Sequence, residues 1–217
     1  MYFRLFLRIT SNFLISTGVG IMFFTYSPLV FDTVNYNLFH TSTADKIVTD
    51  KGVENLSSKT SDSENISPIK AINDEFAVII PSIDVNAPIV ENVSTANEKE
   101  YMDALRDGVA HARGSSLPGL DGNMFLFAHS SLNFWQLGPY ATVFNLLEKT
   151  KKDDQVIIVY HGSVYVYEIF DISVVKGWDT APFYEEYDYP VVTLITCTPA
   201  GTTLNRLVVK AKLVREL

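Results

Sequence analysis

Residues 193–209 read TLITCTPAGTTLNRLVV, two apolar runs separated by a turn. The first run ends at Cys197, and Arg206 opens the second run nine positions later. Upstream, the apolar run at residues 124–128 is followed directly by His129. A thiol, an imidazole and a guanidinium therefore each stand at the end or the start of a predicted strand. Such positions let a β scaffold hold reactive groups rigidly at its surface.

Other segments have the same strand character, a continuous or alternating apolar run bounded by turn residues. We expect strands at residues 76–81, 83–90, 124–128, 155–160, 164–170, 191–196 and 207–214. Helical spacing predicts a helix over residues 98–106 and a shorter one over 143–149, while the glycine-punctuated stretch 108–123 is predicted as loop. Many short strands with two short helices as insertions favour a mainly β fold, a closed or nearly closed barrel.

The last predicted strand indicates which way Arg206 points. Its odd-numbered residues from Leu207 to Leu213 are apolar, whereas Arg206, Lys210 and Lys212 fall on the opposite face. We therefore expect the Arg206 side chain to point away from the apolar face, toward an edge or a groove.

Composition limits the classes of function. The chain has 217 residues and a formal net charge of −8, without a basic stripe, which makes it a poor candidate for binding nucleic acid. Cys197 is the only cysteine, so an intramolecular disulfide framework is excluded. A lone cysteine is more often a buried apolar residue than a reactive one, so its neighbours have to decide its role.

The N-terminal segment has the character of a membrane anchor. Residues 9–31 are mostly apolar and uncharged, Arg4 and Arg8 precede them, and no basic residue follows until Lys46. This predicts a signal-anchor transmembrane helix with the N-terminus in the cytoplasm and the rest outside the cell membrane. A cleaved signal peptide and a buried core helix are the alternatives. The expected layout is an anchor at residues 1–31, a polar extracytoplasmic linker at 32–75 and a folded domain at 76–217.

Cysteine, histidine and arginine together can support acyl transfer. A thiolate is a strong nucleophile near neutral pH, and histidine can carry the proton to a leaving amine and take one back from an incoming amine. An arginine can meet the negative charge that develops on the carbonyl oxygen, or hold a substrate backbone. His129, Cys197 and Arg206 are therefore the candidate catalytic residues.

The sequences around these residues resemble the sortases, cysteine transpeptidases of bacterial cell surfaces. Residues 193–197 are similar to the family's Thr-Leu-x-Thr-Cys signature, and the run Arg-Leu-Val-Val at residues 206–209 follows at the usual distance. Residues 126–129 match the strand that ends in the family's catalytic histidine, although many members have glycine in place of Ala128. Residues 80–89, 108–111 and 116–119 add similar segments, so the resemblance extends from about Phe76 to the C-terminus.

The resemblance implies a fold, a reaction and partners. The fold would be the eight-stranded sortase barrel, with the site in a groove near residues 177–190. Cys197 would attack the Thr–Gly carbonyl of a surface protein's sorting signal similar to Leu-Pro-x-Thr-Gly, and His129 would protonate the departing amine. A cell-wall precursor or a pilin lysine would then resolve the thioacyl intermediate, while Arg206 steadies the oxyanion or the signal.

The resemblance also raises minor expectations. Thr196, next to the nucleophile, is expected to contact substrate. His111, at a position near the family's site, is expected to support substrate binding, with a purely structural histidine as the alternative. No cofactor is expected, but some sortases bind calcium through loop carboxylates. Glu185, Glu186 and Asp188 cluster before the strand at 191–196 without regular ligand spacing, so calcium is left open and no metal ligand is named.

The subclass and the rival functions are separate questions. Pilin-polymerising sortases often carry an Asp-Pro-aromatic lid and a C-terminal membrane helix, and neither is visible, which favours a class D or class E-like member. One rival function is an L,D-transpeptidase-like cell-wall acyltransferase, whose cysteine usually has a Ser-x-Gly-Cys context. The other is a non-enzymatic exported scaffold or adhesion domain, in which Cys197 would be buried and His129 and Arg206 would lie far apart.

Overall fold

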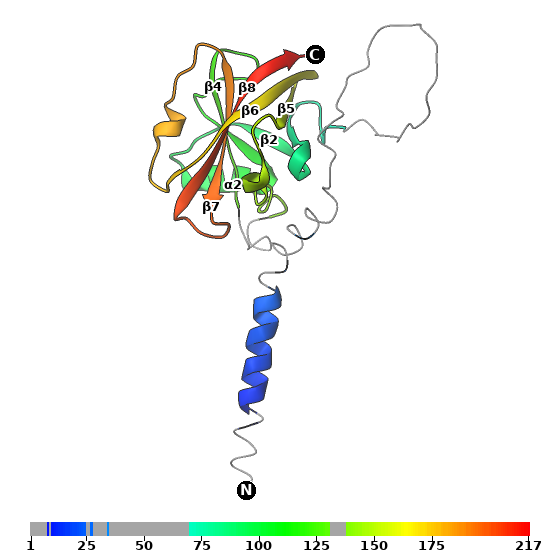
Figure 1. Cartoon of the computed structure of the whole chain (residues 1–217), viewed down its shortest axis with the longest axis vertical. Helices are drawn as coiled ribbons and strands as arrows, with labels where there is room; N and C mark the ends of the chain where they lie inside the picture. Colours follow the sequence, from blue (N-terminus) through cyan, green and yellow to red (C-terminus); the bar gives the residue numbers. More distant parts are fainter. Residues whose placement is uncertain (1–7, 9, 25–26, 28–33, 35–69, 131–137) are drawn as a thin grey trace, which may run out of the picture.

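The structure is a computed structural model, and it describes residues 8, 10–24, 27, 34, 70–130 and 138–217. Residues 10–24 are helical and expose apolar side chains, among them Phe13, Ile21 and Phe23 (blue in Figure 1). Within the described residues, no helix combines the length and the apolar character needed to cross a membrane. Parts of the expected anchor at 9–31, and nearly all of the expected linker at 32–75, lie outside the described residues. Anchor and linker therefore stay predictions.

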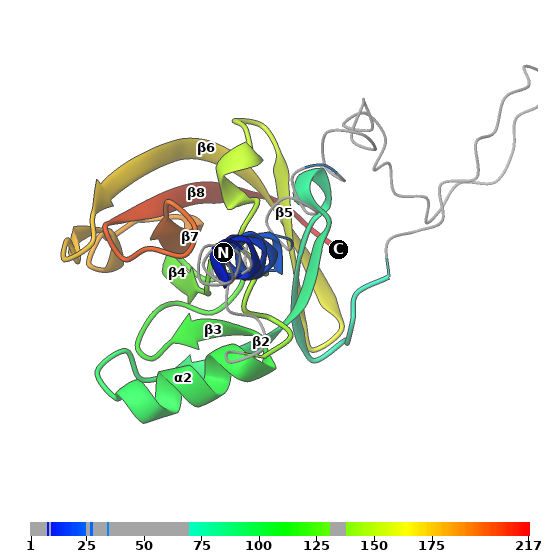
Figure 2. The same cartoon turned by 90° about the horizontal axis from the view of Figure 1, so that it is seen from below.

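The described domain is a closed barrel of eight strands, as the fold prediction required. The strand order around the barrel is β1-β2-β3-β4-β7-β8-β6-β5 (Figures 1 and 2). Two neighbouring pairs are parallel, β2–β3 and β4–β7, and the other pairs are antiparallel. The strands are β1 (Phe76–Ile80), β2 (Val85–Val93), β3 (Val109–Ala112), β4 (Gly122–Phe127), β5 (Gln155–Tyr160), β6 (Ser163–Lys176), β7 (Pro190–Thr198) and β8 (Asn205–Glu216).

Four short helical elements accompany these strands. Helix α2 (Glu98–Asp107) connects the parallel strands β2 and β3 and packs against both (Figure 2). Its first turn is capped by the Asn97 side chain, which accepts a hydrogen bond from Glu100 N at 3.3 Å. The 3₁₀ turns are η1 (Pro81–Ile83), η2 (Leu147–Lys149) and η3 (Ala181–Phe183).

Two details of the predicted secondary structure are wrong. The stretch 108–123, predicted as loop, contains β3, which has four residues and obtains its hydrogen bonds from β2 on one side and β4 on the other. The helix predicted over 143–149 is reduced to the single 3₁₀ turn η2. In both places tertiary packing decides the conformation rather than local periodicity.

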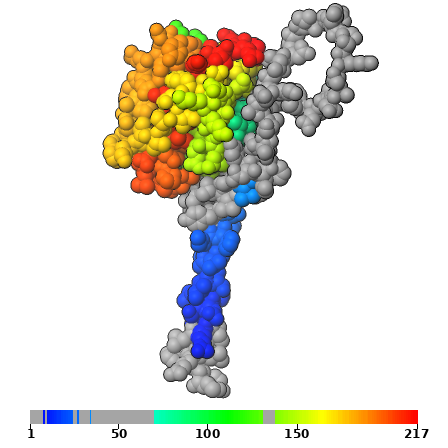
Figure 3. Space-filling view, in the orientation of Figure 1, coloured from blue at the N-terminus to red at the C-terminus, as the bar shows by residue number. Residues whose placement is uncertain are grey.

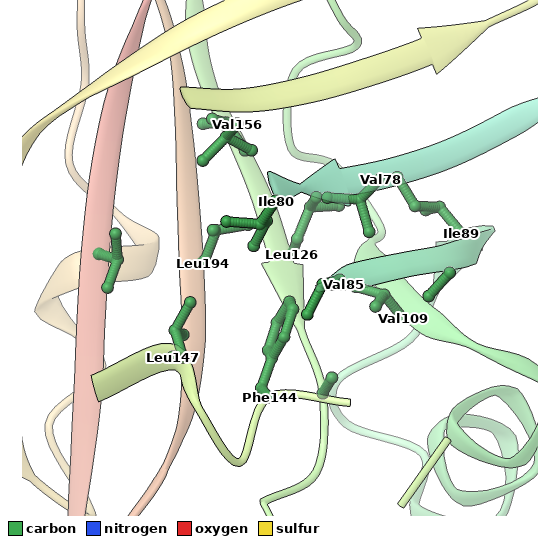
Figure 4. Close-up of a cluster of buried hydrophobic side chains, with 14 of the residues drawn as sticks. Val78, Ile80, Val85, Ile89, Val109, Leu126, Phe144, Leu147, Val156 and Leu194 are labelled. Atoms are coloured by element: carbon green, nitrogen blue, oxygen red, sulfur yellow. The ribbon is translucent and has the colours of Figure 1, made fainter. Parts of the chain in front are cut away.

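The barrel interior is filled by alternate side chains of the strands. Leu126 of β4 and Leu194 of β7 are fully buried there, together with Phe144 and Leu147 from the connection between β4 and β5 (Figure 4). Because successive side chains of a strand point to opposite faces, these buried residues also show which side chains of β4 and β7 point out of the barrel. Residues with the parity of Leu126 and Leu194 point inward, and their immediate neighbours point outward.

Candidate active site

Strands β4 and β7 bring His129 level with Cys197. They run parallel, and the last residue of β4 pairs with Ile195. Hydrogen bonding continues one residue beyond β4, because Ala128 N donates to Ile195 O at 3.2 Å and Thr196 Oγ1 donates to Ala128 O at 2.9 Å. His129 follows Ala128 just as Cys197 follows Thr196, so the two residues stand at the same level of neighbouring strands.

Strands β7 and β8 bring Arg206 to the other side of Cys197. The two residues are direct partners in the antiparallel register. Side chains of directly opposed residues leave the sheet on the same face, with Cβ atoms about 4.5–5.5 Å apart. Their neighbours Thr196 and Leu207 are buried on the core side, whereas Cys197 and Arg206 are half-buried and face outward. Cys197 therefore lies on β7 between β8, which carries Arg206, and the segment that follows β4, which carries His129.

Local backbone bonds position the Arg206 side chain. Its Nη1 donates to Thr203 O and to Asn205 O, both at 3.3 Å, which holds the guanidinium against the turn between β7 and β8. A guanidinium has five N–H donors, so these two bonds leave donors that can meet a substrate oxygen. Sequence alternation predicted this outward orientation correctly.

His129 has the features of a proton carrier. Its Nε2 is buried and has no hydrogen-bond partner among the described residues. Burial lowers the pKa of the imidazole below its ordinary value, so the ring is predominantly neutral at neutral pH. The backbone at this point is fixed on both sides, since His129 O accepts from Phe144 N at 3.4 Å and Ser130 O accepts from Gly201 N at 2.7 Å. A neutral imidazole on a fixed backbone can accept and return one proton.

Thr196 has a different place from the one expected. It is 4% exposed and lies on the core side of β7, the opposite face from Cys197. Its hydroxyl donates to Ala128 O, which ties the strand of the thiol to the strand of the imidazole. The structure thus gives Thr196 a part in holding β4 against β7, and the expectation of direct substrate contact is corrected.

His111 is also corrected. It is 3% exposed on β3, where its register partner is the inward-facing Leu126. Its Nε2 lies 3.0 Å from Ser116 O and 2.9 Å from Ser115 Oγ, and Asn92 N donates to its Nδ1 at 3.4 Å. Both ring nitrogens are engaged inside the fold, so the structure does not bring this histidine to the face that holds Cys197.

The loop between β6 and β7, residues 177–189, covers part of the outer face of β4 and β7, and sequence reasoning missed how it is held. Its orange atoms lie on the outside of the barrel (Figure 3). The buried Asn123 of β4 donates from Nδ2 to Pro182 O at 3.0 Å and accepts from Thr193 Oγ1 at 2.7 Å. Phe183 packs edge-to-face on Phe125, with ring centroids 5.1 Å apart. No local sequence pattern predicts these contacts, because they join residues up to 70 positions apart.

The acidic cluster considered for calcium is partly engaged by a lysine. Lys210 Nζ lies 2.6 Å and 2.9 Å from the two carboxylate oxygens of Glu185, and Tyr187 OH donates to the same carboxylate. Glu186 and Asp188 are exposed. Within the described part of the chain, no group of three or more His, Cys, Asp or Glu side chains is arranged to hold a metal ion.

Comparison with known proteins agrees with this architecture. The sortase domain family model matches residues 78–214. Sortase SrtE1 of Streptomyces coelicolor is 25% identical over 93% of this chain, and Sortase D of Bacillus subtilis is 26% identical over 61% of it. The crystal structure of sortase C-1 from Actinomyces oris superposes with a TM-score of 0.56 at 33% identity, covering 66% of this chain and 76% of that one.

The family match spans more than half of the chain, so this protein belongs to the sortase family, a family of cysteine transpeptidases. The alignments cover 58% of SrtE1 and 60% of Sortase D, so the chain spans about three fifths of the length of these curated relatives. The scaffold alternative expected His129, Cys197 and Arg206 to be scattered. In the structure Cys197 instead pairs with Arg206 across β7 and β8, and His129 follows two residues after the end of β4, the other neighbour of β7.

Proposed function

We propose that this chain is a membrane-anchored transpeptidase that cleaves a sorting signal similar to Leu-Pro-x-Thr-Gly between threonine and glycine. One observation carries the proposal. Cys197 and Arg206 are partners on β7 and β8, and His129, two residues beyond the end of β4, follows the backbone contact between Ala128 and β7 on the other side of the thiol. Such an arrangement supplies the nucleophile, the proton carrier and the cation that acyl transfer to an amine requires.

In the first half-reaction, Cys197 Sγ attacks the threonine carbonyl carbon as a thiolate, with its proton on His129. The carbonyl electron pair moves to oxygen, where Arg206 can donate to the developing charge. The carbon–nitrogen bond to glycine then breaks, and the leaving nitrogen takes the proton from His129. The products are a thioester on Cys197 and a free glycine amine. His129 is then neutral, the state that its buried position favours.

In the second half-reaction, an amine attacks the thioester carbon. The neutral His129 removes a proton from this amine, and the carbon–sulfur bond breaks as the new amide forms. Cys197 leaves as a thiolate beside the protonated imidazole, which restores the starting pair. The acceptor would be a cell-wall precursor or a pilin lysine, and the acyl donor a surface protein that carries the signal.

Membrane attachment and subclass belong to the same proposal. The apolar helical residues 10–24, preceded by Arg4 and Arg8, support a signal anchor that leaves the domain outside the membrane. The names of the two curated relatives, a SrtE1 and a Sortase D, support the class D or E-like assignment. Calcium is left open, and no metal ligand is proposed.

Product analysis tests the proposed reaction. The full-length chain in mild detergent would be incubated with a panel of Leu-Pro-x-Thr-Gly-like peptides and a glycine amine, and the products read by mass spectrometry. We expect cleavage at the Thr–Gly bond and ligation to the amine. The Cys197→Ala variant should give neither product while keeping its circular dichroism spectrum. Ligation at equal rates in both proteins, or in neither over the whole panel, would contradict the proposal.

A further inference from the structure

Lys210 is a nearly buried cation that the proposed reaction does not use. Its side chain is 13% exposed, on the outer face of β8. Its Nζ is 2.6 Å from Glu185 Oε2 and 3.9 Å from an Asp171 oxygen. Burying a lysine is unfavourable unless it is paired, so this residue is placed for its partner rather than for solvation. The partner Glu185 lies in the β6–β7 loop, 25 positions away.

Lys210 fixes a different half of the loop from the contacts already described. Asn123 and Phe125 hold the segment at Pro182 and Phe183. Lys210 holds the returning segment through Glu185, whose carboxylate also accepts from Tyr187, and Tyr187 packs against Tyr189 with ring centroids 5.6 Å apart. The end of the returning segment is also attached, because Gly122 N of β4 donates to Tyr189 O at 3.3 Å. Without the ion pair, the stretch around Glu185, between Phe183 and Tyr189, would lose its charged contact to the barrel.

The carboxylate of Glu185 is charged at neutral pH. Partial burial alone would raise its pKa, but the hydrogen bonds from Lys210 and Tyr187 outweigh burial and hold the pKa below its ordinary value. The contact between β8 and the loop is therefore a charge pair, in which each ion is stabilised by the other.

The loop is fixed at a distance that suits an extended peptide. Lys210 lies four residues from Arg206 on the same face of β8, and Thr193 lies four residues from Cys197 on the same face of β7. At about 3.3 Å per residue, the strand position at which Lys210 holds Glu185 lies about 13 Å along the strands from Cys197. An extended peptide of about five residues spans up to roughly 17 Å. A signal whose reacting carbonyl lies at Cys197 and whose chain runs along this face therefore reaches the loop.

We propose that Lys210 is a positioning residue for the peptide substrate, because its ion pair with Glu185 holds the β6–β7 loop where the upstream residues of a sorting signal must pass. The inference rests on the proposed function for its substrate. The claim that Lys210 holds the loop does not rest on the proposed function, since loop attachment can be measured without any peptide. Lys210 lies too far along the strand from Cys197 to take part in bond making, so its loss acts on peptide binding more than on the chemical step.

The test combines hydrogen–deuterium exchange with peptide kinetics on the full-length chain in mild detergent. In Lys210→Gln we expect faster amide exchange within residues 177–189, and a KM for the ligated peptide raised about fivefold with kcat nearly unchanged. Lys210→Arg keeps the charge and should restore most of both properties. Lys212→Gln is the matched control, because it removes an exposed lysine on the same face of the same strand and should change neither.

A second variant keeps the test decisive if Lys210→Gln proves poorly folded. Glu185→Gln removes the other partner from an exposed loop, and the double variant should lose little more than either single variant, because all three lack the same ion pair. Unchanged loop exchange in both single variants, or a lowered kcat with unchanged KM, would overturn the inference. If the unmodified protein ligates no peptide, the proposed function fails, and the exchange data still decide whether Lys210 holds the loop.

Discussion

Cys197 lies directly opposite Arg206 across the antiparallel pair β7–β8. This relationship gives a thiol, which is uncharged until it loses its proton, a permanent cation at the same level of the next strand. His129 follows two residues after the end of β4, the other neighbour of β7, so the strand of Cys197 has a proton carrier on one side and a cation on the other. This arrangement depends on strand register, and a register shift of one residue would turn the thiol toward the core.

Substitution of Arg206 tests the role of the guanidinium. Lysine keeps the charge but loses the planar fork of donors, so Arg206→Lys should lower kcat/KM about 100-fold, and Arg206→Ala at least as much. Steady-state ligation kinetics with a fixed peptide would measure this. Thermal unfolding should change little, because the side chain is half-buried and its bonds go to the adjacent turn. Near-normal kinetics in the lysine variant would remove Arg206 from the proposed mechanism.

Thr196 offers a test of strand alignment. Thr196→Val keeps the shape but removes the hydroxyl that donates to Ala128 O, next to His129. We expect the free energy of unfolding to fall by about 1 kcal/mol. We expect kcat to fall about tenfold, since the imidazole and the thiol lose part of their alignment. Thr196→Ser restores the donor and should recover most of the rate. A rise in KM with an unchanged kcat would contradict this role and would support the hypothesis that Thr196 contacts the substrate directly.

The titration of His129 has a predicted direction. Burial lowers its pKa, so the folded state binds fewer protons than the unfolded state between the folded pKa and the ordinary value of 6.5. The contribution of the neutral His129 to the free energy of unfolding is fully present above pH 6.5. It is lost as the pH falls through the pKa of the folded state. NMR titration of the imidazole in Cys197→Ala, which removes coupling to the thiol, should give a midpoint below 6.5. A midpoint at or above that value would contradict the buried setting.

Calcium dependence is predicted to be weak. Lys210 already neutralises Glu185, one of the three acidic loop residues, through an ion pair of 2.6 Å. Addition of about 1 mM calcium, or of a chelator, should therefore leave the ligation rate of the unmodified protein within about twofold. Lys210→Gln frees the carboxylate, and any calcium activation should be larger in that variant. Strong activation of the unmodified protein would show that other carboxylates bind the ion.

Most of the barrel could be predicted because strand periodicity is a local property. The apolar runs that became β1, β4, β5 and β7 are visible without any tertiary information. Strand β3 was not, because its four residues, Val109–Ala112, carry no alternation and owe their conformation to β2 and β4. Isolated segments of this length hold no signal that separates a strand from a loop.

The site could be predicted in its chemistry but not in all its contacts. His129, Cys197 and Arg206 were predicted from residue type and position, and their catalytic roles stay predictions. The error for Thr196 was avoidable, because neighbours in a strand point to opposite faces, so Thr196 could not share the face of Cys197. The burial of His111 and the pairing of Lys210 with Glu185 could not be predicted from the sequence, since both depend on contacts between separate segments.

The central claim is that Cys197 forms the acyl intermediate, and trapping that intermediate tests it most directly. The full-length protein would be mixed with a sorting-signal peptide without an amine acceptor, quenched in acid, and analysed by intact mass and peptide mapping. We predict a mass increase equal to the peptide up to its threonine, located on Cys197, that disappears when a glycine amine is added before the quench. Peptide cleavage without an adduct on Cys197, or an adduct that persists in Cys197→Ala, would contradict the account.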